Sequence, residues 1–158
     1  MKEKLAISDL KVIKRVLDRL KIPFFLNFGT LLGVYRDGGF IPDDRDIDIG
    51  ILGYERKQEI CDALKKEGFT HRIINKSIDN LYMIKLVPVD IHMFKDPGKK
   101  YDYYMEGASL YRLPKRFAEF KKIKFLGRNF LIPKKTEEYL EHYYGNWRIP
   151  SNTRTRRN

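Results

Sequence analysis

Two aspartates separated by one residue stand at the head of an apolar run, and this pattern restricts how the chain can fold. Asp46 and Asp48 flank Ile47, and the run continues apolar to Ile51. In an extended strand alternate side chains point to opposite faces, so the two aspartates share one face while the isoleucines enter the core. Like charges held together on a half-buried strand are costly to desolvate, and a divalent cation offsets that cost. The pattern therefore predicts a strand that holds Mg²⁺ or Mn²⁺, ions that suit oxygen ligands.

A second segment, residues 89–94, repeats this arrangement. Asp90 and His92 fall on one face of a predicted strand, and the residues between and beside them are apolar. If the two strands are neighbours, Asp46, Asp48 and Asp90 form a cluster of three carboxylates. Such a cluster can hold one or two Mg²⁺ ions that bridge phosphate oxygens and polarise the phosphorus. The pattern indicates phosphoryl transfer, with the role of His92 left open.

Gly29-Thr30 stands just before a predicted short helix and upstream of the carboxylates. A helix that opens on glycine offers free backbone N–H groups and the positive end of its dipole, and the Thr30 hydroxyl adds a possible donor. The pair is therefore a candidate phosphate-binding element. Lys85, before Asp90, is a further candidate phosphate ligand.

These segments together resemble the nucleotidyltransferase superfamily, and more narrowly the LicD family of phosphocholine and ribitol-phosphate transferases. The resemblance spans roughly residues 24–150. It rests on the residues Gly29-Thr30-Leu31-Leu32-Gly33, Arg36, Gly39-Phe40-Ile41-Pro42, Asp44, Asp46-Ile47-Asp48, Val89-Asp90-Ile91, Ile132-Pro133, Glu138-Tyr139-Leu140 and Tyr144-Gly145-Asn146-Trp147. The chain departs from the family where Asp43 follows the loop proline and Arg45 interrupts the acidic run, and neither Asp43 nor Asp44 is assigned as a ligand.

The resemblance implies a donor that is a CDP-linked alcohol, such as CDP-choline or CDP-ribitol, and an acceptor hydroxyl on a glycan or anionic polymer. It also implies that Asp46, Asp48 and Asp90 serve as catalytic and metal-binding residues, and that three residues hold the donor phosphates: Gly29, Thr30 and Arg36. Two alternatives stay open. One is a nucleotidyltransferase that moves a nucleoside monophosphate to a small molecule, protein or RNA; the other is a non-enzymatic, basic nucleic-acid-binding domain.

The rest of the chain predicts a single α/β (α+β) domain over residues 1–150, with a small mixed sheet backed by helices. Hydrophobic periodicity predicts helices over 8–21, 55–66 and 136–144 and a short one over 31–36. Strands are expected over 24–27, 46–51, 70–74, 81–87, 89–94, 117–125 and 130–132. Pro88 suggests a bulge or a sheet edge there, and residues 151–158 form a polar, arginine-rich tail.

The net charge of +11 favours partners that carry phosphate or another negative charge. An anionic acceptor or peripheral contact with a membrane surface fits this charge, and nucleic acid is the less favoured partner. We found no signal-peptide pattern and no apolar stretch of transmembrane length. These observations lead us to expect a cytoplasmic protein.

Overall fold

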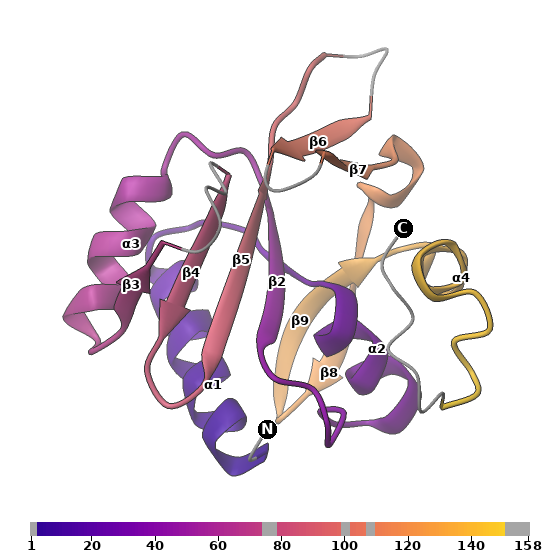
Figure 1. The fold of residues 1–158 in the computed structure, drawn as a ribbon, viewed down its shortest axis with the longest axis horizontal. Coiled ribbons are helices and arrows are strands. Elements are labelled where there is room, and N and C mark those ends of the chain that lie inside the picture. Colours follow the sequence, from indigo (N-terminus) through magenta and orange to yellow (C-terminus); the bar gives the residue numbers. More distant parts are fainter. Residues whose placement is uncertain (1–2, 74–78, 99–101, 107–109, 151–158) are drawn as a thin grey trace.

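The computed structural model describes residues 3–73, 79–98, 102–106 and 110–150. Within these residues a mixed sheet follows the order β3-β4-β5-β2-β1-β9-β8, and a separate hairpin pairs β6 with β7 (Figure 1). The elements are α1 (Glu3–Arg19), β1 (Phe25–Leu26), α2 (Phe28–Asp37), β2 (Ile47–Leu52), α3 (Lys57–Lys66), β3 (Thr70–Arg72), β4 (Asn80–Ile84), β5 (Pro88–Phe94), β6 (Tyr103–Glu106), β7 (Leu110–Leu113), a 3₁₀ turn (Lys115–Phe117), β8 (Phe120–Phe125), β9 (Arg128–Pro133) and α4 (Thr136–Tyr144).

The centre of the sheet is the parallel pair β2 and β5, which align Asp48 with Asp90. The predicted mixed α/β fold is thus confirmed. Apolar and polar side chains alternate along both strands as predicted. The apolar side chains on one face are buried in the core: Ile47, Ile49, Ile51, Val89, Ile91 and Met93. The opposite face carries Asp48, Asp90 and His92. α3 lies beside β3, α1 passes behind β4 and β5, and α2 and α4 lie on the other side of β2 (Figure 1).

β1 is only two residues long, yet it joins the two halves of the sheet. Phe25 pairs with Gly50 of β2 on one side and with Leu131 of β9 on the other. The Phe25 ring covers Gly50 so closely that a Cβ atom there would lie 2.2 Å from the ring. A side chain at residue 50 would therefore have to displace the buried Phe25 ring, and α2 starts one residue after β1.

Some predicted bounds differ from the structure. The helix expected over 8–21 is α1, which begins at Glu3. The short helix expected over 31–36 is α2, which begins at Phe28, and the strand expected over 117–125 is β8, which begins at Phe120. Pro88 is the first residue of β5, a strand that lies between β4 and β2, not at the sheet edge. Proline is tolerated at the start of a strand, and the alternation that places Asp90 is kept.

α4 was predicted correctly over residues 136–144. The described residues share one hydrophobic core, which extends from α1 to Trp147. No helix among them is both long enough and apolar enough to cross a membrane. The arginine-rich tail, residues 151–158, lies outside the described residues. The single domain over 1–150 and the cytoplasmic location stay predictions.

Candidate active site

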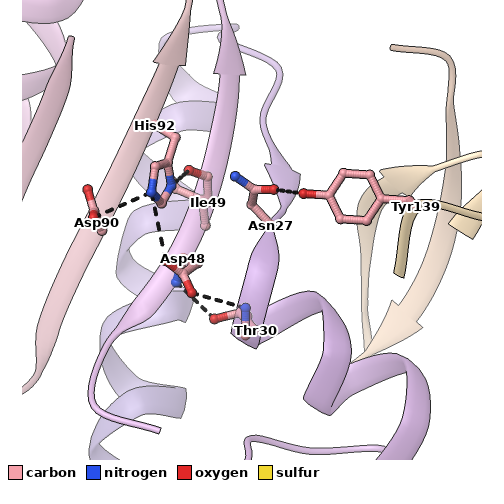
Figure 2. A network of polar contacts seen from close by, with 8 residues as sticks. Asn27, Thr30, Asp48, Ile49, Asp90, His92 and Tyr139 are labelled. Carbon is pink, nitrogen blue, oxygen red and sulfur yellow. Dashed lines mark hydrogen bonds and ion pairs between the residues drawn. The ribbon is translucent and has the colours of Figure 1, made fainter. Parts of the chain in front are cut away.

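Asp48 is the centre of the site, and two hydrogen bonds join it to the start of α2. Its side chain is fully buried. Its Oδ2 atom accepts the backbone N–H of Gly29 at 3.1 Å, and its own backbone N–H donates to the Thr30 hydroxyl oxygen at 2.9 Å (Figure 2). A carboxylate at a helix N-terminus is stabilised by the dipole as well as by the N–H group. Gly29 thus holds the Asp48 carboxylate, and Thr30 holds the Asp48 backbone.

A side chain at Gly29 would press against two carboxylates of the site. A Cβ atom at this position would lie 2.3 Å from Asp44 Oδ2 and 3.3 Å from Asp48 Oδ2. Phe28, just before it, has a φ of 36°, which is uncommon for a residue other than glycine. The chain therefore enters α2 through a constrained turn that brings its backbone against two carboxylates.

The other half of the site comes from β5. His92 Nε2 lies 3.4 Å from Asp90 Oδ2 and 3.9 Å from Asp48 Oδ1, so the imidazole stands between the two carboxylates (Figure 2). The ring is 3% exposed, and its Nδ1 is 3.3 Å from the carbonyl oxygen of Ile49. The Phe28 ring packs edge-on against it at a centroid distance of 4.9 Å. Asp48, Asp90 and His92 therefore form one compact group.

The carboxylates form two overlapping groups that share Asp48. One group contains Asp48, Asp90 and His92, and the other contains Asp44, Asp46 and Asp48; within each, the ligand atoms lie within 4.8 Å of one another. The sequence predicted that Asp46, Asp48 and Asp90 come together, and the structure brings each of Asp46 and Asp90 to Asp48. Carboxylates this close repel each other, and Asp48 is buried, so the donor set fits a divalent cation.

Asp44 and His92 were not assigned as site residues by sequence reasoning. The signal was present for both, because Asp44 continues the every-second-residue pattern of Asp46 and Asp48, and His92 shares a strand face with Asp90. The sequence could not predict the path of the loop that brings the Asp44 carboxylate next to Gly29.

Tyr82 adds a hydroxyl to this site. It lies opposite Asp90 in the antiparallel pair β4 and β5. Burial raises the pKa of the Tyr82 phenol, and the negative charges of Asp46 and Asp90 raise it further. The phenol therefore stays protonated at neutral pH and can donate a hydrogen bond beside both carboxylates.

A buried hydrogen bond connects the site to α4. The Tyr139 hydroxyl donates to Asn27 Oδ1, and both side chains are fully buried (Figure 2). Burial raises the pKa of Tyr139 well above its ordinary value, so the phenol remains a neutral donor. The Asn27 backbone N–H in turn donates to the Asp48 carbonyl at 3.1 Å. Asn27 thus links α4, the start of α2 and β2.

Two of the candidate phosphate ligands lie away from Asp48. Arg36 is seven residues beyond Gly29, which corresponds to about 10 Å along the helix. Its guanidinium pairs with Asp37 at 2.7 Å and donates to the Trp147 carbonyl at 3.2 Å. Lys85 lies in the turn after β4, with its Nζ 5.6 Å from the Phe69 ring centroid. The structure does not gather these two cations around the carboxylates.

Comparison with known proteins gives the family. Residues 21–135 match the family described as LicD/FKTN/FKRP, nucleotidyltransferase domain. The chain belongs to this family. The predicted LicD resemblance is thereby confirmed, and the match contains Asp46, Asp48 and Asp90 as well as the start of α2.

Curated relatives include ribitol-5-phosphate transferase FKTN from Mus musculus, which is 31% identical in an alignment of 156 residues that covers 91% of this chain. The Homo sapiens protein of the same name is 30% identical over the same length. The chain spans about a third of the length of these relatives, 33% in each case.

Solved structures confirm the fold class. The lincosamide antibiotic adenylyltransferase LnuA, solved with lincomycin bound, superposes with a TM-score of 0.63 at 18% identity, covering 87% of this chain and 85% of the other. ANT(2")-Ia in complex with adenylyl-2"-tobramycin gives 0.60 at 16% identity, covering 91% and 78%. At these identities the likeness shows a nucleotidyltransferase-like fold.

Proposed function

We propose that this chain is a metal-dependent phosphotransferase domain. It would move a phospho-alcohol, such as ribitol phosphate or phosphocholine, from a CDP-linked donor to a hydroxyl of a glycan or anionic polymer. The observation that carries the proposal is the meeting of Asp48 and Asp90 across β2 and β5 at the N-terminus of α2. Membership of the LicD family supports this donor class.

Asp46, Asp48 and Asp90 are the residues that would hold Mg²⁺ or Mn²⁺. The fit rests on the donor set, because Asp48 is fully buried among other carboxylates and its ligand atoms lie within 4.8 Å of theirs. A bound divalent ion would supply charge neutralisation on the phosphates and polarise the phosphorus that is attacked.

In the proposed reaction the acceptor hydroxyl oxygen attacks the phosphorus that carries the alcohol. A new O–P bond forms, the P–O bond to CMP breaks, and the hydroxyl proton passes to a carboxylate. Asp90 is our candidate for this base, because it lies at the edge of the buried group and is 19% exposed. Tyr82 can donate a hydrogen bond to substrate on the same side.

The N-terminus of α2 is our candidate element for the donor phosphates. Its positive dipole end faces the carboxylate group, and the Gly29 N–H and Thr30 hydroxyl lie there. Both groups also bond to Asp48: the Gly29 N–H donates to its carboxylate, and the Thr30 oxygen accepts from its backbone N–H. They would therefore hold Asp48 in place beside the donor as well. Arg36 would have to leave Asp37 to reach a phosphate.

A second candidate is transfer of a nucleoside monophosphate, which the fold likeness to adenylyltransferases favours. The two reactions differ in which phosphorus is attacked and therefore in the product released. Phospho-alcohol transfer releases CMP, whereas nucleotidyl transfer from an NTP releases pyrophosphate.

The experiment is incubation of the protein with Mg²⁺ or Mn²⁺ and a panel of CDP-alcohols and NTPs, with products identified by mass spectrometry. We expect CMP from a CDP-alcohol and expect Asp46→Asn and Asp48→Asn to abolish its release. Pyrophosphate from an NTP would favour the second candidate instead. Turnover by either variant near the wild-type rate at saturating metal would contradict the proposed site.

A further inference from the structure

We infer that His92 is a nitrogen ligand of the proposed metal site and that the site prefers Mn²⁺ to Mg²⁺. This inference rests on the proposed function, because it concerns the same carboxylates. The Asp48, Asp90 and His92 group differs in chemistry from the all-carboxylate group Asp44, Asp46 and Asp48. An imidazole in the ligand set selects for transition ions, whereas Mg²⁺ favours oxygen ligands.

The orientation of the ring supports a ligand role. Nδ1 faces the Ile49 carbonyl at 3.3 Å, and this oxygen can only accept, so Nδ1 carries the proton. In the neutral imidazole the lone pair is then on Nε2, which faces Asp48 and Asp90 (Figure 2). Metal-binding histidines characteristically donate their second ring N–H to a backbone carbonyl or carboxylate in this way.

The distances also suit a shared ion better than a direct ion pair. A charge-assisted hydrogen bond from a histidine nitrogen to a carboxylate is about 2.7–2.9 Å long. Nε2 lies 3.4 Å from Asp90 Oδ2 and 3.9 Å from Asp48 Oδ1. Two ligands that each bind one cation at about 2.1 Å are about 3.0–3.5 Å apart. The Asp90 distance lies in that range, and the Asp48 distance exceeds it by a few tenths of an ångström.

The surroundings hold the ring in this position. The imidazole is 3% exposed, and the Phe28 ring packs against it edge-on. β5 lies in the interior of the sheet, so the backbone of residue 92 is held by β2 and β4 on either side. A ligand fixed in this way binds a cation without losing much side-chain freedom, which favours tight binding.

The test is pulsed electron paramagnetic resonance of Mn²⁺ bound to the full chain. We expect ¹⁴N modulation from a directly coordinated imidazole, which ¹⁵N-histidine labelling should convert to the ¹⁵N pattern. His92→Gln should remove the modulation and weaken Mn²⁺ binding by about 10- to 100-fold, with a smaller loss for Mg²⁺. The matched control is His71→Gln, since His71 lies in β3 at the far edge of the sheet and should affect neither quantity.

The outcomes separate this inference from the proposed function. Mn²⁺ binding with no nitrogen modulation in the wild-type protein would overturn the His92 role and leave the carboxylate site intact. Equal losses of Mn²⁺ and Mg²⁺ affinity in His92→Gln would overturn the preference. Absence of any divalent-ion binding would overturn both the inference and the proposed function. Because the labelling experiment uses the wild-type chain, it decides the question even if His92→Gln fails to fold.

Discussion

Gly29 shows how a single residue sets the geometry of the site, because its missing side chain leaves room for Asp44. We predict that Gly29→Ala displaces the Asp44 carboxylate and weakens Mn²⁺ binding by about tenfold or more, the scale expected when a group that orients a ligand is lost. Alanine should otherwise favour a helix by up to about 1 kcal/mol, so helix propensity cannot cause the loss. Metal titration by calorimetry measures the effect.

The control for this prediction is the same substitution in an Asp44→Ala background. With the carboxylate removed, the added Cβ atom no longer meets Asp44 Oδ2, and Gly29→Ala should have little further effect on metal affinity. An equal loss in both backgrounds would show that the Asp44 contact is not the cause.

At this scale the sequence predicted that Asp46, Asp48 and Asp90 come together, because alternation along two strands decides which side chains share a face. Their catalytic and metal-binding roles stay predictions. The sequence also placed Gly29-Thr30 at the start of a helix facing these aspartates. The sequence could not show that the Arg36 guanidinium lies away from these carboxylates. Its guanidinium lies two turns along α2 and pairs with its neighbour Asp37, a contact that depends on side-chain rotamers.

At the scale of elements, α4 is joined to the site through the buried bond from Tyr139 to Asn27. We predict that Tyr139→Phe lowers the free energy of unfolding by about 1–3 kcal/mol, because the Asn27 carboxamide oxygen loses its donor in a buried place. It should also lower the transfer rate, since Asn27 adjoins the start of α2. Urea denaturation and the CMP-release assay measure the two effects.

Tyr143→Phe is the matched control. The Tyr143 hydroxyl also lies on α4, but it donates to the Arg112 carbonyl in β7 at 2.6 Å, away from the carboxylates. Its loss should destabilise the protein with little change in the transfer rate per folded molecule. If both variants lowered that rate equally, the effect on transfer could not be assigned to the hydrogen bond between Tyr139 and Asn27.

Element positions were predicted best where the local pattern is strong, as in α4 and β2. β1 is the opposite case, since two residues contain too little pattern, and their strand character depends on pairing with β2 and β9 far along the chain. The order of the sheet likewise follows from long-range pairing. The prediction of a sheet edge at Pro88 was wrong because proline is also tolerated as the first residue of an interior strand. Sequence spacing alone did not show that β5 begins at Pro88.

At the scale of the whole molecule, the charge of +11 suggests how an acceptor is recruited. We predict that truncation after Pro150 raises the apparent KM for an anionic polymeric acceptor and leaves donor hydrolysis nearly unchanged. Acceptor affinity should also weaken steeply with salt, because such contacts are screened over about 8 Å at physiological ionic strength. Equal losses in both assays would place the tail at the active site.

The most direct test of the whole account is divalent-ion binding by wild-type protein and by Asp48→Asn, measured from the free Mn²⁺ signal. Asp48 belongs to both ligand groups, so we predict saturable binding in the wild type and a loss of affinity of about 100-fold or more in the variant. Asp62→Asn, an exposed change on α3, should bind like the wild type. Equal Mn²⁺ affinity in wild type and Asp48→Asn would contradict the claim that these carboxylates form the metal site.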